Sequence, residues 1–403
     1  MRDSLSGLRV LDFSHVVAGP VCGMLLGDLG ADVSKIEPLG GELGRAIGPP
    51  WQNGESLVAL SVNRSKRGLA IDLKSEAGRA VVRRMALSAD VVLESFRPGV
   101  MARFGLDYES LRHDHPRLVY CSISAYGQTG PGRDKAGVDG IIQAASGLMS
   151  MLGAGEGEPC KVGIPVADMS TGYLATIATL AALHQVRASG QGQHLDLSLF
   201  NSTLMLQQVG LAFHLSTGEE PGRLGSAAPY AAPNEAYPSA DGWLMIAAYH
   251  PERWRRFCGL VGAPGLREDP RFATNDDRVA HRALLHAELD PLLRRHGTDH
   301  WLALLSEADI LCAPIASYGD VCGSLEYRAN GVEITTEHPI AGPVRMPGLA
   351  IGTDRATPYR AAPMLVQHSM RILADYGIPA AEALALHASG ALVAQDLPSD
   401  ASA

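Results

Sequence analysis

The stretch that decides the fold runs from Leu8 to Glu37 and reads LRVLDFSHVVAGPVCGMLLGDLGADVSKIE. Residues 8–13 predict a short buried strand. Residues 21–29 predict a helix, which Gly30 ends as a C-terminal cap. Residues 32–37 predict a second strand. A strand, a loop, a helix and a strand in this order indicate a parallel sheet with helices on its faces.

The same alternation continues along the first half of the chain. Further strands are predicted at 68–73, 90–94, 118–123 and 194–199, and helices at 75–88, 168–187 and 201–215. Repeated strand–helix units of this kind favour a Rossmann-like, doubly wound α/β domain.

The composition changes after residue 215. Residues 216–241 are rich in Gly, Pro, Ala and Ser, and a strand at 242–247 and helical patterns over 251–308 follow. We therefore expect three segments, which are a large Rossmann-like domain at 1–215, a small α+β middle domain at 225–325, and a return linker with the C-terminal part of the large domain at 330–403. A helix is predicted at 366–376, and the tail after Leu386 is predicted to fray.

Composition narrows the function classes. The 403 residues carry a formal net charge of −9, which argues against a nucleic acid partner because phosphate binding needs a positive surface. No long apolar run or signal-type start is seen, so we expect no membrane partner and a cytoplasmic location. The six cysteines form no CxxC pair, so neither disulfides nor a metal site is expected.

Two segments could bind an anionic ligand. The loop His15–Pro20 lacks the GxGxxG and P-loop patterns, which makes a nicotinamide cofactor unexpected, yet it leaves a parallel strand where such sheets bind ligands. The basic cluster Asn63–Arg67, with Lys74, Arg97 and Arg103, suits an ADP-like anion. A plain turn and a solvated basic surface are the alternative interpretations.

Two further segments could carry chemistry. Asp168 precedes a long predicted helix, where it could be simply an N-cap or a rigidly held nucleophile. The glycines of Ala125–Gly132 suit a tight loop whose N–H groups are free for an oxyanion or a phosphate, and a plain turn is equally compatible.

Four motifs taken together resemble the class III coenzyme A transferases, the family of formyl-CoA transferase and carnitine CoA-transferase. They are the 8–37 stretch, Asn63-Arg-Ser-Lys-Arg67, Ala125-Tyr-Gly-Gln-Thr-Gly-Pro131 and Ala167-Asp-Met-Ser-Thr-Gly172, and the similarity continues through His338-Pro-Ile-Ala-Gly-Pro343. The resemblance implies an interlocked homodimer, in which each large domain is built from both chain ends.

The resemblance also implies a mechanism and its site. Asp168 attacks a donor thioester to give an aspartyl anhydride, and the CoA thiolate then converts the anhydride to an aspartyl-CoA thioester. Acyl-CoA is a substrate, and no cofactor is expected to be tightly bound. By resemblance His15, Val16, Ala18, Ile71, Lys74, Ser95, Phe96, Arg103 and Phe104 contact CoA, and we add Arg64, Lys66 and Arg97 from the basic cluster.

The same fold hosts acyl-CoA racemases, which need two bases. Their histidine falls at Val138 and their glutamate near His250, so two-base proton exchange is not supported. A non-catalytic CoA-binding protein is the remaining alternative. Val17 replaces the glutamine of the formyl-CoA branch, and the closer likeness is to enzymes that transfer CoA from succinyl-CoA to C4–C6 dicarboxylic acids such as itaconate. Candidate acceptor contacts are Val17, Arg45, Tyr126, Val138, Arg223, Tyr230 and His250.

Overall fold

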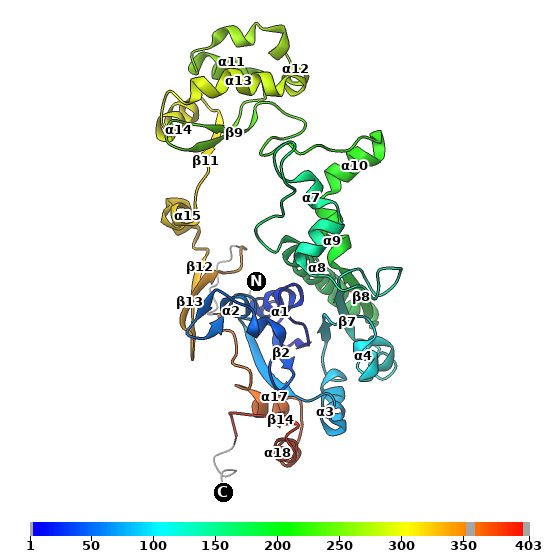
Figure 1. Cartoon of the computed structure of the whole chain (residues 1–403). Helices are drawn as coiled ribbons and strands as arrows, with labels where there is room; N and C mark the ends of the chain where they lie inside the picture. The colour runs from blue at the N-terminus through cyan, green and yellow to red at the C-terminus, as the bar shows by residue number, and fades with distance from the viewer. Residues whose placement is uncertain (1–2, 352–358, 398–403) are drawn as a thin grey trace. The chain divides into compact units, whose positions relative to one another are not determined.

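The computed structural model describes residues 3–351 and 359–397 (Figure 1). These residues form two compact units. Unit 1 contains the described residues of Met1–Leu148, Lys161–Glu219 and Gly331–Ala403. Unit 2 consists of Met149–Cys160 and Glu220–Asn330. Residues 149–160, which the sequence assigned to the large domain, therefore lie in unit 2.

Unit 1 is built on a seven-stranded sheet of order β14–β5–β2–β1–β6–β7–β8. Its strands are β1 (Arg9–Asp12), β2 (Asp32–Glu37), β5 (Lys66–Ile71), β6 (Val91–Glu94), β7 (Val119–Ser124), β8 (Gln193–Ser198) and β14 (Leu392–Val393). All neighbours are parallel except β14 and β5. Counted along the chain, the six parallel strands have the Rossmann order 3-2-1-4-5-6. The predicted Rossmann-like sheet from both chain ends is confirmed.

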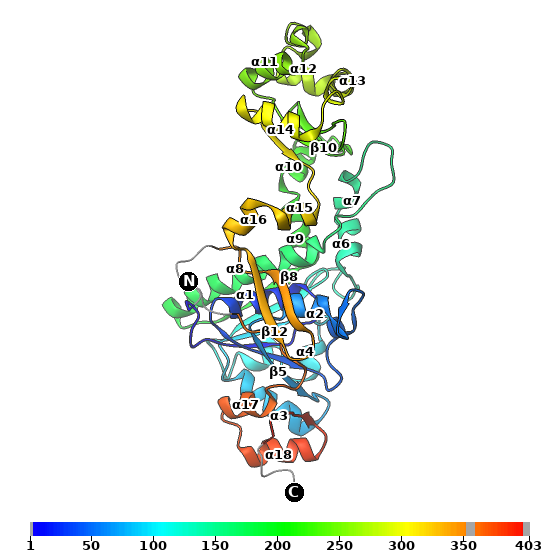
Figure 2. The same cartoon turned by 90° about the vertical axis from the view of Figure 1, so that its left-hand side faces the viewer.

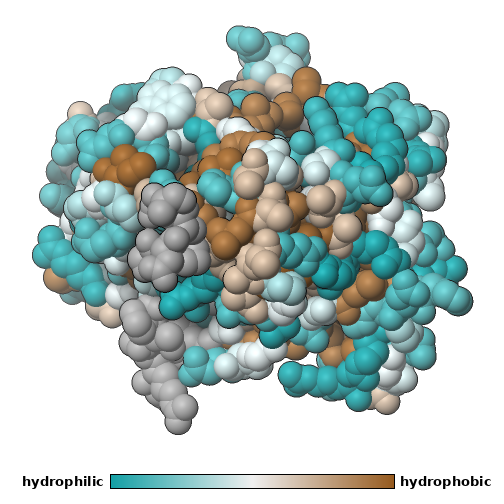
Figure 3. All heavy atoms as spheres, turned by 90° about the horizontal axis from the view of Figure 1, so that it is seen from below, coloured by the Kyte–Doolittle hydropathy of each residue, from teal (hydrophilic) through white to brown (hydrophobic). Residues whose placement is uncertain are grey.

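Helices cover both faces of this sheet, because side chains alternate between the faces along each buried strand. Val10 packs into the core formed with α1 (Ala18–Asp28), α8 (Val166–Ser189) and α9 (Leu199–Leu206). Leu11 packs into the opposite core, formed with α3 (Glu76–Ala86), α17 (Ser369–Asp375) and α18 (Ala380–Ala388). Figures 1 and 2 show α3, α17 and α18 together beneath the sheet. Seen from below, apolar patches lie among hydrophilic side chains (Figure 3).

Shorter elements complete unit 1. They are η1 (Leu43–Ala46), α2 (Leu57–Val62), α4 (Val100–Arg103), α5 (Tyr108–Leu111), α6 (Asp139–Ala145) and α10 (Gln208–Thr217), with the hairpins β3 (Trp51–Gln52)–β4 (Glu55–Ser56) and β12 (Glu333–His338)–β13 (Gly342–Pro347). The helix α7 (Leu148–Met151) crosses the boundary to unit 2.

Unit 2 has its own sheet and core. Its antiparallel sheet has the order β11 (Leu311–Pro314), β10 (Trp243–Ala247), β9 (Asn234–Pro238). Its helices are α11 (Pro251–Leu260), η2 (Pro264–Arg267), η3 (Pro270–Phe272), α12 (Asn275–Ala280), α13 (Arg282–Leu293), α14 (Thr298–Glu307), α15 (Tyr318–Gly323) and α16 (Leu325–Asn330). The core includes Phe257, Leu289 and Trp301.

Some predicted elements were wrong. β5 begins at Lys66 rather than Gly68, because buried ion pairs neutralise the two charged residues at its start. The tail after Leu386 does not fray up to residue 397, since β14 pairs with β5 there; residues 398–403 lie outside the described part. β9 was missed within the Pro-rich segment 216–241.

Helix α8 is long and apolar enough to span a membrane by length and composition alone. Core helices of soluble proteins pass the same test, and α8 packs against both α1 and α9. This one helix is therefore weak evidence for a membrane segment.

A buried ion pair lies between the sheet and α1. Lys66 Nζ is 2.8 Å from Asp12 Oδ2 and donates hydrogen bonds to Pro20 O and Asn63 Oδ1. Both charged side chains are fully buried. A Cβ added to Gly23 of α1 would lie 2.5 Å from Asp12 Oδ2. Glycine is required at this position so that α1 can cover the pair.

Gly23→Ala should therefore destabilise unit 1 by about 1–3 kcal/mol, because the added methyl group overpacks an immobile ion pair. Urea unfolding followed by circular dichroism measures the change. Gly40→Ala is the control, since its Cβ would meet nothing within 4 Å. Equal midpoints for the two variants would contradict this account of α1 packing.

Candidate active site

A pocket of about 320 Å³ lies at the carboxyl ends of the central strands of unit 1. The strand order reverses between β1 and β6, and ligands of doubly wound sheets bind at such a reversal. The loops after β1, β6 and β7 all contribute. The lining residues are His15, Ser95, Phe96, Arg97, Pro98, Ser124, Ala125, Lys135, Ala136, Gly137, Val138 and Ile141.

Polar contacts join the first two of these loops. The His15 backbone N–H donates to Ser95 Oγ at 3.0 Å, and Ser95 Oγ is also 3.1 Å from His15 Nδ1. The ring centroids of His15 and Phe96 are 5.5 Å apart. Burial lowers the pKa of His15, which favours a neutral imidazole at pH 7. The imidazole is thus a fixed, uncharged wall of the pocket.

Glu94, which the sequence did not single out, holds the β6 loop. Its carboxylate accepts the Phe96 N–H at 2.8 Å from a buried position at the end of β6. Burial raises the pKa of Glu94 to about 7, and the Ser122 hydroxyl opposes this shift. The sequence could have indicated this role, because a glutamate at the end of an apolar strand is expected to be buried and a buried carboxylate needs a hydrogen-bond partner.

Asp168 lies in the first turn of α8. The N-cap of this helix is Pro165, so the alternative role of Asp168 as N-cap is wrong. Asp139 Oδ1 instead accepts the Ala167 N–H at 2.8 Å and fixes the helix start. Within residues 3–351 and 359–397, no hydrogen bond to the Asp168 carboxylate is seen. Burial, and then the charge of Asp139, raise its pKa to about 7.

Close packing brings the Asp168 turn to the His15–Ala18 loop. A Cβ on Gly172 would lie 2.7 Å from Ala18 O, so α8 and α1 touch through backbone at this point. Met169 packs against the cluster that contains Val16 and Val17. A desolvated carboxylate at a helix start, with no protein donor on it, is suited to nucleophilic attack once it is ionised.

The pocket collects five of the predicted site residues, namely His15, Ser95, Phe96, Arg97 and Val138. Lys135, which was not predicted from the sequence, adds an exposed cation to the same lining as Arg97. Its position just beyond the Gly-rich loop could have indicated from the sequence that it lies near the ligand. Two cations on one rim suit an anionic ligand.

Several predicted CoA contacts are wrong at the level of the side chain. Arg64 is buried in an ion pair with Asp28 at 2.7 Å, and Lys66 is buried against Asp12. The Ile71 side chain is fully buried in the core beneath the sheet. These three side chains stabilise the fold and are not available to a ligand.

Other predicted contacts lie outside this pocket lining. Lys74 and Arg103 are exposed, and Phe104 packs partly against the core beneath the sheet. Tyr126 packs against Phe200 with ring centroids 5.6 Å apart. Their roles as ligand contacts stay predictions, as do those of Val16 and Ala18 in the loop itself.

The predicted acceptor residues divide between the units. Arg45 forms a two-pronged pair with Glu37 at 2.7 and 2.8 Å, so its charge is already neutralised, which argues against a role in reading a substrate carboxylate. Arg223, Tyr230 and His250 belong to unit 2, where His250 caps α11. Val17 lies in unit 1, in the buried cluster against which Met169 packs.

The Gly-rich loop 125–132 does not offer all its N–H groups to a ligand, contrary to expectation. Gly127 N donates to Ser124 Oγ at 2.9 Å, and Gln128 N donates to Asp196 Oδ2 at 2.9 Å. Gly127 has φ = +97°, a conformation that favours glycine. These contacts make the loop a rigid wall beside the pocket.

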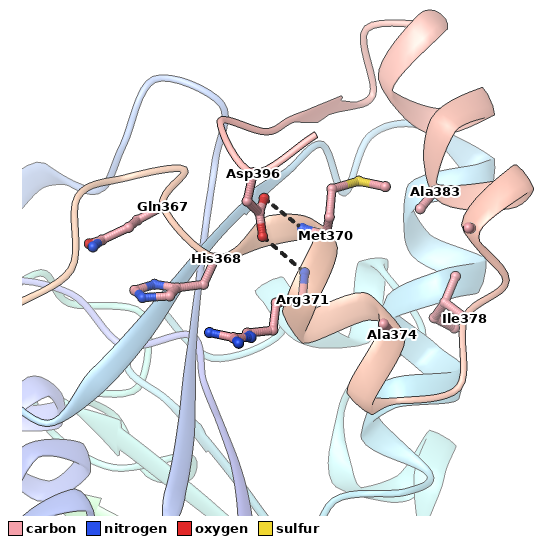
Figure 4. Close-up of a pocket in the computed structure, with 9 residues that line it drawn as sticks. Gln367, His368, Met370, Arg371, Ala374, Ile378, Ala383 and Asp396 are labelled. Carbon is pink, nitrogen blue, oxygen red and sulfur yellow. Dashed lines mark hydrogen bonds between the residues drawn. The ribbon is translucent and has the colours of Figure 1, made fainter. Parts of the chain in front are cut away.

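A second pocket, of about 480 Å³, lies between α17 and α18 (Figure 4). Its one acidic lining residue, Asp396, accepts the N–H groups of Met370 and Arg371 at 2.9 and 3.0 Å. Its carboxylate is therefore committed to the backbone. Across the part of the chain that the structure describes, no cluster of three metal-ligating side chains is found.

Comparison with known proteins decides the family. The sequence model of CoA-transferase family III matches residues 5–369. The chain belongs to CoA-transferase family III. It is 38% identical to the succinate–glutarate CoA-transferase of Agrobacterium fabrum, over 93% of this chain and 96% of that protein. It is 36% identical to the succinyl-CoA:glutarate CoA-transferase of Mus musculus, over 92% and 86%.

A solved structure agrees with this assignment. A CaiB/BaiF family protein from Brucella suis superposes with a TM-score of 0.83 at 35% identity, covering 93% of this chain and 99% of that one. The chain is accordingly a CoA-transferase, and CoA thioesters are its substrates.

In this CoA-transferase, Asp139→Asn should lower the pKa of Asp168, because the substitution removes the negative charge that disfavours a second carboxylate. At pH values below its pKa the Asp168 carboxyl is protonated. Removal of the Asp139 charge should move the midpoint of this ionisation from about 7 to a lower pH. Carbon-13 NMR of labelled aspartate carboxyls measures the shift, and Asp168→Asn assigns the signal. An unchanged midpoint would show that Asp139 does not act on Asp168 through its charge.

Proposed function

We propose that this CoA-transferase moves CoA from succinyl-CoA to a C4–C6 dicarboxylate such as glutarate or itaconate, with Asp168 as covalent nucleophile. The observation that carries the proposal is the Asp168 carboxylate itself. It is half-buried, has a raised pKa, and accepts no hydrogen bond from the described protein. An ionised carboxylate in such a place lacks solvation and is reactive toward a thioester carbonyl.

The chemistry balances without an external energy source. An Asp168 oxygen forms a bond to the succinyl carbonyl carbon, the carbon–sulfur bond breaks, and CoA leaves as thiolate. The thiolate attacks the Asp168 carbonyl and releases succinate, which leaves an aspartyl-CoA thioester. The acceptor carboxylate then attacks this thioester, the carbon–sulfur bond breaks, and CoA leaves as thiolate from the mixed anhydride. The thiolate attacks the acceptor carbonyl carbon, which releases the Asp168 carboxylate and the acceptor acyl-CoA. Each step exchanges one activated acyl group for another.

The pocket supports the CoA-binding part of the proposal. Arg97 and Lys135 supply positive charge for phosphates, and Phe96 supplies an apolar face. His15 and Ser95 are held together at the same pocket by their hydrogen bond. The names of the two relatives reported above support succinyl-CoA and a dicarboxylate as the substrates.

The alternative reaction, racemisation of an acyl-CoA, needs a base on each side of the α-carbon. Val138 stands in the pocket lining where the racemase histidine is expected, and it cannot carry a proton. The remaining alternative is non-catalytic CoA binding. Binding alone does not need a desolvated carboxylate such as that of Asp168.

Succinyl-CoA alone, followed by hydroxylamine, should leave a hydroxamate on Asp168, because hydroxylamine attacks the aspartyl thioester. Peptide mass spectrometry detects this adduct. Glutarate, itaconate, citramalate and oxalate are then offered as acceptors, and acyl-CoA products are separated by mass. Asp299→Asn, at an exposed aspartate in the first turn of α14, is the matched control and should leave the adduct on Asp168 unchanged.

Full activity of Asp168→Ala with no adduct on the native protein would overturn the covalent mechanism. Transfer only to oxalate, a C2 dicarboxylate, would overturn the assignment of a C4–C6 acceptor and leave the nucleophile in place. Deuterium exchange at the α-carbon without an acceptor would favour the racemase.

We also propose that the enzyme is an interlocked homodimer. A groove of about 830 Å³ in unit 1 is lined by apolar side chains of α1, α2 and α8. Tyr173 and Ile177 of α8 line it and are exposed, and α9 and α10 expose Met205 and Val209. Apolar surface of this extent is typical of a protein interface. A second copy of this chain is the occupant that the proposed interlock supplies.

Analytical ultracentrifugation should find a dimer for the native protein and monomer or aggregate for Ile177→Glu, because a charge in an apolar interface is not solvated. Leu284→Glu on α13, also at an exposed apolar position, is the control and should leave the mass unchanged. Two differently tagged preparations should not exchange subunits without denaturant. Rapid exchange would contradict the interlock, and a native monomer would contradict the dimer.

A further inference from the structure

The loop between β1 and α1 contains a strained residue. Val16 has φ = +66°, in the left-handed region that β-branched residues rarely adopt. Such a conformation persists only where the surrounding structure holds it. The Val16 N–H donates to Glu42 Oε2 at 3.1 Å, so Glu42 is the side chain that holds this peptide group.

Glu42 is itself rigid and buried. Its Oε2 also accepts the Gly44 N–H at 2.5 Å, and its own N–H donates to Glu37 Oε1 at 3.1 Å. Its Oε1 is 3.7 Å from Lys35 Nζ and accepts no hydrogen bond within the described residues. One carboxylate oxygen of Glu42 therefore faces Lys35 while the other accepts two N–H groups.

Lys35 holds the other side of the same loop. Its fully buried ammonium group donates to Ser14 O at 2.9 Å. We call the Lys35–Glu42 ion pair, with its bonds to Ser14 O and Val16 N, the loop clamp. Between these two points the His15 N–H is bound by Ser95 Oγ. Three consecutive residues are thus fixed by side chains from three different segments.

We propose that Glu42 is a positioning residue for acyl-CoA binding and transfer, which acts by holding Val16 in the left-handed conformation. This inference rests on the function proposed above. The turn at Val16 lets His15 line the CoA pocket while Val17 joins the buried cluster with Val21 and Val62, against which Met169 packs. The loop clamp thereby fixes the position of the His15–Ala18 loop relative to the nucleophile Asp168.

The geometry explains why a clamp is needed at this place. An extended Val16 would send the chain in another direction after His15 and move Val17 out of the buried cluster against which Met169 packs. A misplacement of about 1 Å at reacting groups can cost about a hundredfold in rate. Glycine would adopt the turn without strain, so valine makes the loop conformation depend on Glu42.

The test is a double-mutant cycle between Glu42→Gln and Val16→Gly, with succinyl-CoA as donor and glutarate as acceptor. Glutamine keeps the shape of Glu42 and removes its charge, so the pair with Lys35 is lost. Glu42→Gln alone should raise KM for succinyl-CoA about tenfold and lower kcat. In the Val16→Gly background the same change should cost about twofold or less, because glycine needs no clamp.

Two further variants separate positioning from a general loss of stability. Glu42→Asp keeps the charge and should recover part of the KM. Glu109→Gln, which breaks only an exposed pair with Arg112, should leave KM and kcat unchanged. Equal costs of Glu42→Gln in both backgrounds would overturn the positioning role.

Hydrogen–deuterium exchange keeps this inference distinct from the proposed function. Glu42→Gln should speed exchange at the Val16 amide and leave the β6 and β7 amides protected. Unchanged Val16 exchange would overturn the clamp whatever the enzyme catalyses. Absence of CoA transfer by the native protein would instead overturn the proposed function, and faster Val16 exchange would then still support the clamp.

Discussion

The buried ion pair between Asp12 and Lys66 is the interaction on which the site depends. Burial works against both charges, yet Lys66 and Lys35 hold the pKa of Asp12 below its usual value. Burial also lowers the pKa of Lys66, to about 8. An isolated charge at this depth would not be tolerated. The pair therefore constrains β1, β5 and the first turns of α1 together, through Asp12, Pro20 O and Asn63.

The pair is one case of a wider arrangement. Carboxylates at strand ends bind the N–H groups of the loops that follow. Asp12 accepts from Ser14 N at 2.9 Å, and Glu94 accepts from Phe96 N at 2.8 Å. Dinucleotide-binding sheets use glycines to bring backbone to a phosphate. This CoA-transferase instead uses acidic side chains to fix its loops, and the ligand meets loops that are already shaped.

Much of the fold could be predicted because buried parallel strands form apolar runs that are visible in one sequence. The loop after β1 was found for the same reason, whereas Asp168 was singled out by the motif resemblance of the segment around it. Partners across the fold could not be found. Arg64 and Lys66 looked like ligand-binding cations, since their carboxylates lie 36 and 54 residues away. No local pattern reveals such a partner, so these two cations of the basic cluster were assigned to CoA in error.

Asp139 and Glu42 show the same limit. Each acts through a backbone N–H of a distant segment, Ala167 in one case and Val16 in the other. Every residue except proline has a backbone N–H, so the residue type does not reveal which N–H groups bind a distant side chain. The positive φ of Val16 is equally invisible, because valine does not signal a left-handed turn as glycine does.

The core beneath the sheet joins the two extremes of the chain. Leu11, Val82 and Tyr120 share it with Ile372 and Leu392, and β14 closes the edge at β5. During synthesis the first 120 residues leave the ribosome with a third of this core missing. Their apolar face must wait for some 250 further residues, about 10–50 s at typical elongation rates, before it is covered. Folding of this enzyme is thus a late event with high contact order, and chaperones have a long interval in which to bind the unfinished sheet.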